Sequence, residues 1–317
     1  MPEYAFFHGQ FMPLSEAKIG IMTHALHYGT GCFEGIRGHW DSERESFCLF
    51  RVQDHYKRML EGCRILKMNL PYSLDDLCRL TGELLEKSGY RESVYIRPLA
   101  YKSSDVLAIR LHDVEDDFLI AVTTFPPYLD VEKGVRCCTS SWRRVDDTVV
   151  PPRGKICGIY VGSALAKTEA QENGFDEAIV LTNDGHVCEG SAENIFLALQ
   201  GKLVTPPSSE SILMGITRDS VIKLAKNELG LDTIERQVDR SELYVAEECF
   251  FTGTAANVAP ILEIDRRPVG NGQIGETTAR LQKLYAEVML GRNPEYSDWY
   301  YLVSPATPMQ SGQKRVT

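Results

Sequence analysis

Residues 153–170 read RGKICGIYVGSALAKTEA and contain two lysines in very different settings. Lys167 lies in an alanine-rich stretch that predicts a helix over residues 159–173, ended by Gly174. Its neighbours are polar, so we expect its side chain on a solvent-exposed helix face. Lys155 lies just before this helix, after the PPRG stretch at 151–154, where a side chain can project into a cleft. A lone lysine there is usually a surface residue, so its role depends on the segments around it.

The segment 188–194, CEGSAEN, closes one predicted hairpin and opens the next. Its small residues let a backbone approach a flat ligand closely. Glu189 and Glu193 fit a general acid/base pair, and they fit equally well two turn acids that accept hydrogen bonds from backbone amides. The segment therefore indicates a ligand-facing loop but does not fix the chemistry.

Two further segments could bind an anion. Residues 215–220, GITRDS, begin a helix predicted over 216–229, where free backbone N–H groups and the Thr217 hydroxyl suit a phosphate. An ordinary capped helix explains this segment equally well. Residues 252–256, TGTAA, end a buried strand with a loop able to donate more N–H groups. A lysine, a carboxylate and a phosphate cradle are together what pyridoxal phosphate requires, for its Schiff base, its ring nitrogen and its phosphate.

The hydrophobic patterns divide the chain into two α+β domains. Alternating runs typical of strands and two helical patterns fill the first part, and strand clusters with interspersed helices fill the second. Strict βαβ alternation is not seen, which favours an α+β class. We predict a small domain over residues 1–125, a linker over 126–134, a large domain over 135–303 and a disordered polar tail over 304–317.

The composition argues against several classes of protein. The 317 residues are 43% apolar and 25% charged, as in ordinary globular domains. A net charge of −10 and a pI near 5.3 argue against nucleic acid or an anionic membrane as the main partner. No signal peptide and no membrane-spanning apolar run are recognisable. The nine cysteines, with no C-x-x-C pair, favour free thiols in the cytoplasm over a metal site or a disulfide framework.

Seven motifs, in order along the chain, carry a resemblance to a known family. They are MTHALHYGTGCFEGIRG at 22–38, DHYKRM at 54–59, VYIRPL at 94–99, Lys155 with Tyr160, CEGSAEN at 188–194, TPPSSESILMGITRDSVIKLA at 205–225 and EECFFTGTAANVAP at 247–260. Together they resemble the fold-type IV pyridoxal phosphate enzymes, and specifically the branched-chain aminotransferases. The resemblance runs from about Tyr4 to Val303. It implies a pseudo-barrel in the large domain, with the cofactor between the domains.

The resemblance also implies roles for individual residues. Lys155 would form the Schiff base and move the proton between the substrate Cα and the cofactor C4′. Glu189 would pair with the pyridinium nitrogen, Tyr160 would bond the ring 3-oxygen, and Arg58 would grip the phosphate with its guanidinium fork. The other implied cofactor contacts are Ala192, Ile216, Thr217 and Thr254. The implied substrate contacts are Tyr28, Phe33, Tyr95, Arg97, Thr254 and Ala255, with Trp142 either lining the pocket or packed in the core.

The implied reaction moves an amino group between leucine, isoleucine or valine and 2-oxoglutarate by a ping-pong mechanism. Aromatic walls would take the aliphatic side chain, and Arg97 would take the second carboxylate of 2-oxoglutarate. In this family the segment around Tyr28 reaches the site of a neighbouring subunit, which implies a homodimer or a higher homo-oligomer.

Three departures from the family pattern leave alternatives open. Ala192 stands where glycine is more usual, and Met214 where proline or an acid is more usual. Arg110 and His112 form an Arg-x-His pair of the kind that binds the substrate carboxylate in D-amino-acid aminotransferases, but they lie further downstream here. We interpret this pair as part of an interface or entrance loop. The alternatives are a D-amino-acid or (R)-amine transaminase, an aminodeoxychorismate lyase, and a catalytically silent cofactor-binding protein.

Overall fold

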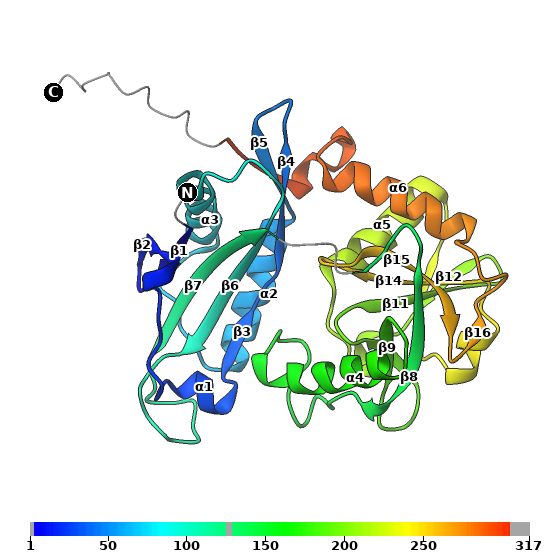
Figure 1. Cartoon of the computed structure of the whole chain (residues 1–317), viewed down its shortest axis with the longest axis horizontal. Coiled ribbons are helices and arrows are strands. Elements are labelled where there is room, and N and C mark those ends of the chain that lie inside the picture. Colours follow the sequence, from blue (N-terminus) through cyan, green and yellow to red (C-terminus); the bar gives the residue numbers. More distant parts are fainter. Residues whose placement is uncertain (1–2, 125–128, 305–317) are drawn as a thin grey trace.

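The computed structural model describes residues 3–124 and 129–304, and it shows two mixed sheets with helices packed on them (Figure 1). This arrangement of strands and helices confirms the predicted α+β class. The predicted tail at 304–317 falls, apart from Ser304, outside the described residues, as does part of the predicted linker. Within the described ranges, no helix is both long and apolar enough to cross a bilayer.

The first sheet is built mainly from the N-terminal part of the chain. Its strand order is β17-β5-β4-β6-β7-β1-β2, with β3 paired on β6. The strands are β1 (Tyr4–Phe7), β2 (Gln10–Pro13), β3 (Gly31–Phe33), β4 (Ile36–Asp41), β5 (Ser46–Phe50), β6 (Val94–Lys102), β7 (Asp116–Thr124) and β17 (Tyr300–Val303). The short α1 (His24–Tyr28) precedes β3, and α2 (Val52–Ile65) and α3 (Leu74–Ser88) contribute to the core of this sheet.

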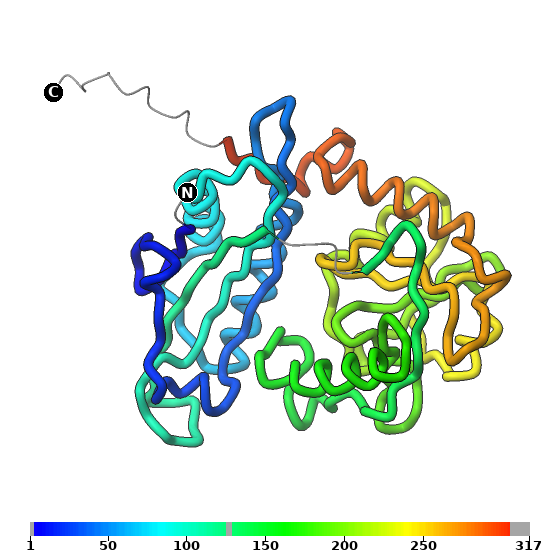
Figure 2. The backbone as a smooth tube through the Cα atoms, in the orientation of Figure 1, coloured from blue at the N-terminus to red at the C-terminus, as the bar shows by residue number. Residues whose placement is uncertain are grey.

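Strand β17 corrects the predicted domain boundary. The large domain was predicted to extend to residue 303, but β17 pairs antiparallel with β5 in the first sheet. In Figure 2 the red segment that carries β17 lies beside the blue strands labelled β4 and β5 in Figure 1. The sequence YYLV reads as a strand but does not say which sheet edge it joins, because pairing depends on where the preceding helix delivers the chain.

The second sheet has the order β10-β9-β8-β15-β14-β11-β12-β13, with β16 on β15. Its strands are β8 (Val135–Arg143), β9 (Glu177–Leu181), β10 (Val187–Gly190), β11 (Asn194–Leu199), β12 (Lys202–Thr205), β13 (Thr233–Glu235), β14 (Glu248–Gly253), β15 (Asn257–Ile264) and β16 (Arg267–Pro268). The helices are α4 (Tyr160–Glu172), α5 (Ile216–Leu229) and α6 (Glu276–Met289). Short 3-10 turns lie at Leu14–Glu16, Cys157–Ile159, Ser208–Glu210, Arg240–Tyr244 and Pro294–Trp299.

Strands β9, β10 and β11 of the second sheet are buried on both faces. In β11, Ile195 and Leu197 pack into one core with residues of β8, β9 and β15. Phe196 and Ala198 point the other way, into a second core that includes Leu224 of α5 and residues of α6. Because successive side chains of a strand face opposite sides, one strand serves both cores. Helices α5 and α6 therefore cover one face of the second sheet, and its other face packs into a separate apolar core.

Local sequence signals explain the helix ends. Ser73 accepts a hydrogen bond from the amide of Asp76 at 3.1 Å, and the Asp76 carboxylate accepts one from the Ser73 amide, which forms a capping box at the start of α3. Helix α5 begins after Gly215 and ends at Gly230, whose φ of 65° is left-handed. Glycine adopts that conformation without the strain of a Cβ, so it stops the helix at the predicted residue.

Candidate active site

A cavity of 570 Å³ opens between the two sheets, and it contains most of the predicted site residues. This volume lies within the usual range for small-molecule sites. Its walls include Lys155 and the predicted cofactor contacts Arg58, Tyr160, Ala192, Ile216, Thr217 and Thr254. They also include the predicted substrate contacts Phe33, Tyr95, Arg97 and Ala255. Glu189 lines a smaller adjoining cavity that Lys155 and Tyr160 also border.

Lys155 is positioned by contacts with the first sheet. Its carbonyl oxygen accepts a hydrogen bond from the Phe33 amide of β3 at 3.0 Å, so its backbone is tied to the first sheet before α4 begins. Its Nζ donates to Tyr160 Oη at 2.7 Å. The same Nζ lies over the rings of Phe33 and Tyr160, at 5.2 and 5.3 Å from their centroids. The amine therefore points into the cavity between a phenol hydroxyl and two aromatic faces.

Glu189 is a buried carboxylate held by three donors. Arg144 Nη2 lies 2.8 Å from its Oε1, and the Leu213 amide and Asn194 Nδ2 donate to its Oε2 at 3.1 and 3.2 Å. Burial raises the pKa of Glu189, while the positive charge of Arg144 opposes that rise. Donors on both oxygens favour the ionised form. Arg144 lies outside the motifs that carry the family resemblance.

No local signal in the sequence singles out Arg144. It directly follows Arg143, the last residue of β8, where Ser141, Trp142 and Arg143 are all exposed and side chains no longer alternate between two faces. In the structure Arg143 is exposed, while the side chain of Arg144 is only 11% exposed and reaches Glu189. Its Nε also donates to the Ser211 carbonyl at 3.1 Å, which fixes the loop before α5.

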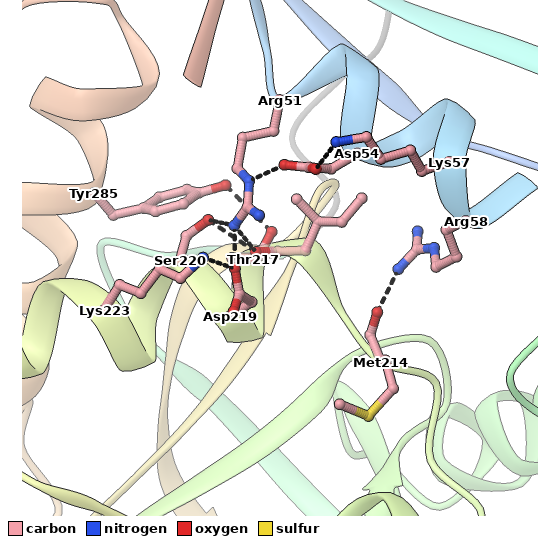
Figure 3. A network of polar contacts seen from close by, with 11 residues as sticks. Arg51, Asp54, Lys57, Arg58, Met214, Thr217, Asp219, Ser220, Lys223 and Tyr285 are labelled. Atoms are coloured by element: carbon pink, nitrogen blue, oxygen red, sulfur yellow. Dashed lines mark hydrogen bonds and ion pairs between the residues drawn. The ribbon is translucent and has the colours of Figure 1, made fainter. Parts of the chain in front are cut away.

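The first turn of α5 and Arg58 of α2 face the same part of the cavity. Arg58 Nε and Nη2 contact the two carboxylate oxygens of Glu34 at 2.7 and 2.8 Å. Its Nη1 donates to the Met214 carbonyl at 2.8 Å (Figure 3). These contacts use three of the five guanidinium N–H donors, so the remaining ones suit a bound anion. With 11% of its side chain exposed, Arg58 is not an ordinary exposed helix charge.

Glu34 holds Arg58 in place from beneath. Burial alone would raise the pKa of Glu34, but the charges of Arg58 and His55 outweigh it and lower that pKa well below its usual value. The carboxylate is therefore ionised and can bind Arg58 through both oxygens. Residue 215, just before α5, must be a glycine because a Cβ there would lie only 2.0 Å from Asn194 Oδ1.

Arg97 and Tyr95 project from β6 on the same side of the sheet, as residues two apart on a strand do. Arg97 Nη2 donates to Tyr95 Oη at 3.3 Å, and its guanidinium lies 4.5 Å from the centre of the Phe33 ring. On the opposite wall, the loop with Thr254 and Ala255 is fixed to the first sheet by Arg37. Its Nε and Nη2 donate to their carbonyl oxygens at 3.3 and 3.2 Å. Arg37 was not among the predicted site residues.

Four predicted substrate residues lie elsewhere. Among the described residues, the cavity walls do not include Tyr28, Arg110, His112 or Trp142. Arg110 and His112 are exposed in the loop between β6 and β7, and Tyr28 is partly exposed at the end of α1. Trp142 is 46% exposed, so it does not pack in the core, and its predicted role as a substrate contact stays a prediction.

Lys167 also departs from expectation. Its Nζ lies 2.6 Å from Glu177 Oε2 and donates to the Asp176 carbonyl at 2.7 Å, and only 19% of its side chain is exposed. The predicted solvent-exposed setting is wrong because α4 packs on β8 and β9, and Lys167 reaches the first residue of β9. Glu177 has no exposed surface, so the pair is an internal one.

Known proteins share this fold and much of this sequence. The family model for amino-transferase class IV matches residues 31–264. A probable branched-chain-amino-acid aminotransferase from Aquifex aeolicus is 49% identical over 297 residues, covering 94% of this chain and 96% of the relative. The chain therefore belongs to the class IV aminotransferases, and the predicted resemblance is confirmed.

Two solved structures are also similar. A branched-chain aminotransferase from Thermoproteus uzoniensis, crystallised with norvaline, has a TM-score of 0.91 and 39% identity, covering 96% of this chain and 100% of that one. A branched-chain amino acid aminotransferase from T.th., complexed with N-(5'-phosphopyridoxyl)-L-glutamate, has a TM-score of 0.89 and 39% identity, covering 95% and 98%. These similarities confirm the predicted two-domain, fold-type IV architecture.

Proposed function

We propose that this protein is a pyridoxal phosphate-dependent transaminase that moves the amino group between branched-chain L-amino acids and 2-oxoglutarate. The observation that carries the proposal is the placement of Lys155 in one cavity with Tyr160, beside buried Glu189 and opposite Arg58 and the start of α5. The relatives with norvaline and with a phosphopyridoxyl-glutamate adduct support both substrate classes.

The residues present fit the cofactor. Lys155 would bind it covalently, Glu189 would face its ring nitrogen, and Tyr160 would hydrogen-bond its ring oxygen. Arg58 and the amides at the start of α5 (Ile216 and Thr217), together with Ala192 and Thr254, would hold the remaining ring and phosphate contacts. The fit rests on donor chemistry: the first N–H groups of a helix lack partners within the helix, and α5 turns them toward the cavity that Arg58 also lines.

When bound, pyridoxal phosphate supplies an electron sink for the electrons released at the substrate Cα. The chain's own residues then have three tasks. Lys155 Nζ carries the proton to and from that carbon, and the Tyr160 hydroxyl at 2.7 Å orients the amine. Glu189 keeps negative charge beside the ring nitrogen, with Arg144 holding its carboxylate in position. Burial of the carboxylate strengthens that interaction because little water screens it.

The substrate end of the cavity suits two ligands in turn. The aromatic rings of Phe33 and Tyr95 offer apolar walls for a branched side chain. Arg97, which stacks on Phe33 and contacts Tyr95, offers a positive charge for the second carboxylate of 2-oxoglutarate. The D-amino-acid alternative needs Arg110 and His112 at the substrate carboxylate, and within this chain both lie outside the cavity.

The test is the absorption spectrum of the purified protein before and after adding L-leucine and, separately, D-alanine. A yellow chromophore that bleaches with L-leucine supports the proposal, while bleaching with D-alanine alone moves the assignment to the D-amino-acid enzymes. Lys155→Ala should abolish the chromophore and the transfer. The matched control is Lys133→Ala, since Lys133 has 86% of its side chain exposed. Loss of activity in this control as well would contradict the assignment of Lys155.

We also propose that the protein is a cytoplasmic homodimer. An exposed apolar face surrounds α1 and the loop before β7. It includes Ile21, which is 82% exposed, and Ile109, which is 91% exposed. The two segments adjoin, because His24 Nε2 lies 2.7 Å from the Ala108 carbonyl. Tyr28 lies on the same helix, as a residue that serves a neighbouring site would. All nine cysteines are unpaired, as in reducing compartments.

Sedimentation equilibrium tests the dimer. The wild type should have twice the chain mass of 35.6 kDa. Ile109→Asp with Ile21→Asp should give monomers with reduced transfer activity, because Tyr28 would lose the site it completes. Val245→Asp is the control, since Val245 is 71% exposed in the second domain. A monomeric and fully active wild type would contradict this proposal.

A further inference from the structure

A buried arginine lies behind the proposed phosphate site and outside the cavity. Arg51 precedes α2 and has a left-handed backbone with φ of 51°. Its amide donates to the Trp299 carbonyl at 2.7 Å, and its guanidinium lies 5.0 Å from the centre of the Trp299 ring. Only 8% of its side chain is exposed. The backbone of Arg51 is thus fixed in an uncommon conformation, with the side chain turned inward.

The guanidinium of Arg51 contacts both α2, which packs on the first sheet, and α5, which packs on the second (Figure 3). On its own side, Nε contacts Asp54 Oδ2 of α2 at 2.7 Å. Toward α5, Nη1 contacts Asp219 Oδ2 at 2.5 Å, Ser220 Oγ at 2.9 Å and the Ile216 carbonyl at 3.4 Å. All three acceptors lie in the first turns of α5. Arg51 therefore ties the start of α2 to the start of α5.

These two helices carry the two parts of the proposed phosphate site. Arg58 lies on α2, seven residues after Arg51, which caps the start of that helix. Ile216 and Thr217 are the first residues of α5 and line the cavity. The Thr217 hydroxyl also lies 3.2 Å from Tyr285 Oη of α6, so the first turn of α5 is held from two directions. A change in the position of α5 relative to α2 would separate the donors that must converge on one phosphate.

We propose that Arg51 is a positioning residue for cofactor binding: through Asp219 and the Ile216 carbonyl, it holds the first turn of α5 in register with Arg58. This inference rests on the proposed assignment of the phosphate site. A lysine cannot replace Arg51, because one ammonium cannot reach Asp54 and Asp219 in the fixed geometry of a guanidinium fork. Small misplacements of binding groups are costly, so the effect should appear in affinity as well as in stability.

The test measures the dissociation constant of pyridoxamine 5′-phosphate for the full-length protein by equilibrium dialysis, well below the melting temperature. Arg51→Met and Arg51→Lys should each weaken binding by about tenfold or more. Lys102→Met is the matched control. Lys102 is 1% exposed and pairs with Asp116 at 2.8 Å within the first sheet, so its loss should lower the melting temperature and leave the dissociation constant unchanged.

The outcomes separate the inference from the function on which it rests. Arg58→Met, measured in parallel, should weaken binding strongly, and an unchanged constant would overturn the phosphate site itself. If Arg58→Met weakens cofactor binding and Arg51→Met binds normally, only the proposed role of Arg51 is overturned. Where Arg51→Met does not fold, Asp219→Ala removes the carboxylate that Arg51 contacts on α5 and leaves its contacts with Asp54, Ser220 and the Ile216 carbonyl. It should then weaken binding by a smaller factor than Arg51→Met, and unchanged affinity overturns the inference.

Discussion

Replacing Lys167 with methionine should destabilise the protein by about 3–5 kcal/mol, the usual cost of removing one partner of a buried ion pair. Methionine keeps the apolar stem and removes the charge. Glu177 has no exposed surface, and Lys167 lies 2.6 Å from it with 19% of its side chain exposed. The variant therefore leaves an uncompensated carboxylate inside the second sheet. The sequence predicted a different setting, with Lys167 on a solvent-exposed helix face.

Thermal unfolding followed by circular dichroism measures the effect. The entropy of unfolding grows with chain length, so for a chain of this size a loss of about 1 kcal/mol in stability lowers the melting temperature by about 1.5 °C. The predicted destabilisation therefore corresponds to a fall of roughly 5–8 °C. Lys133→Met removes a surface pair and should melt within about 1 °C of the wild type. Adding Glu177→Leu to Lys167→Met should recover most of the loss, because an apolar pair replaces the charges. A Lys167→Met variant that melts with the wild type would refute this reasoning.

Three further perturbations test the site. Arg97→Ala should reduce kcat/KM for 2-oxoglutarate by about tenfold or more and for leucine much less, and equal losses would contradict dual recognition. Arg144→Met should raise the pKa of Glu189 further and lower kcat, which an alkaline shift in the acid limb of the pH–rate profile would reveal. Glu193 has a pKa raised well above 4.5 by burial and by Glu177, so its contribution to stability is present at low pH and is lost as pH rises through the raised pKa. Glu193→Gln should make the decline of the unfolding free energy above pH 4.5 less steep by the equivalent of up to one proton, roughly 1.4 kcal/mol per pH unit. An unchanged slope would contradict a protonated Glu193.

Most helices and strands could be predicted because the residues that begin and end them lie next to them in the sequence. Helix α5 follows prediction at both ends, since Gly215 and Gly230 bracket an unbroken helical pattern. Helix α4 was predicted over 159–173 and spans 160–172. The sheet membership of β17 was not predictable in the same way. Its pairing with β5 joins residues on opposite ends of the chain, and no local signal records such a contact.

The site divides along the same line. Loops of small residues and the start of a helix can be recognised in the sequence. Thr217 and Thr254 were predicted from such segments, and both line the cavity. Arg144 and Arg37 act through contacts with residues far along the chain, and an arginine alone does not reveal its partner. The exposure of Trp142 was also not predictable from its local sequence. It lies among the last residues of β8, where Ser141 is also exposed and strand alternation no longer separates an inner from an outer side.

The two lysines of the segment 153–170 show how context decides function. Lys167 is held against Glu177, so its charge compensates a buried carboxylate and its donors are committed to the fold. Lys155 meets a hydroxyl and aromatic faces and, among the described residues, forms no ion pair. A carboxylate partner at Lys155 would hold the ammonium and oppose its reaction with a carbonyl group, whereas Tyr160 orients the amine without fixing its charge. Glu189, which borders the same small cavity as Lys155, is instead paired with Arg144. This arrangement supports the proposal that Lys155 is the reactive amine.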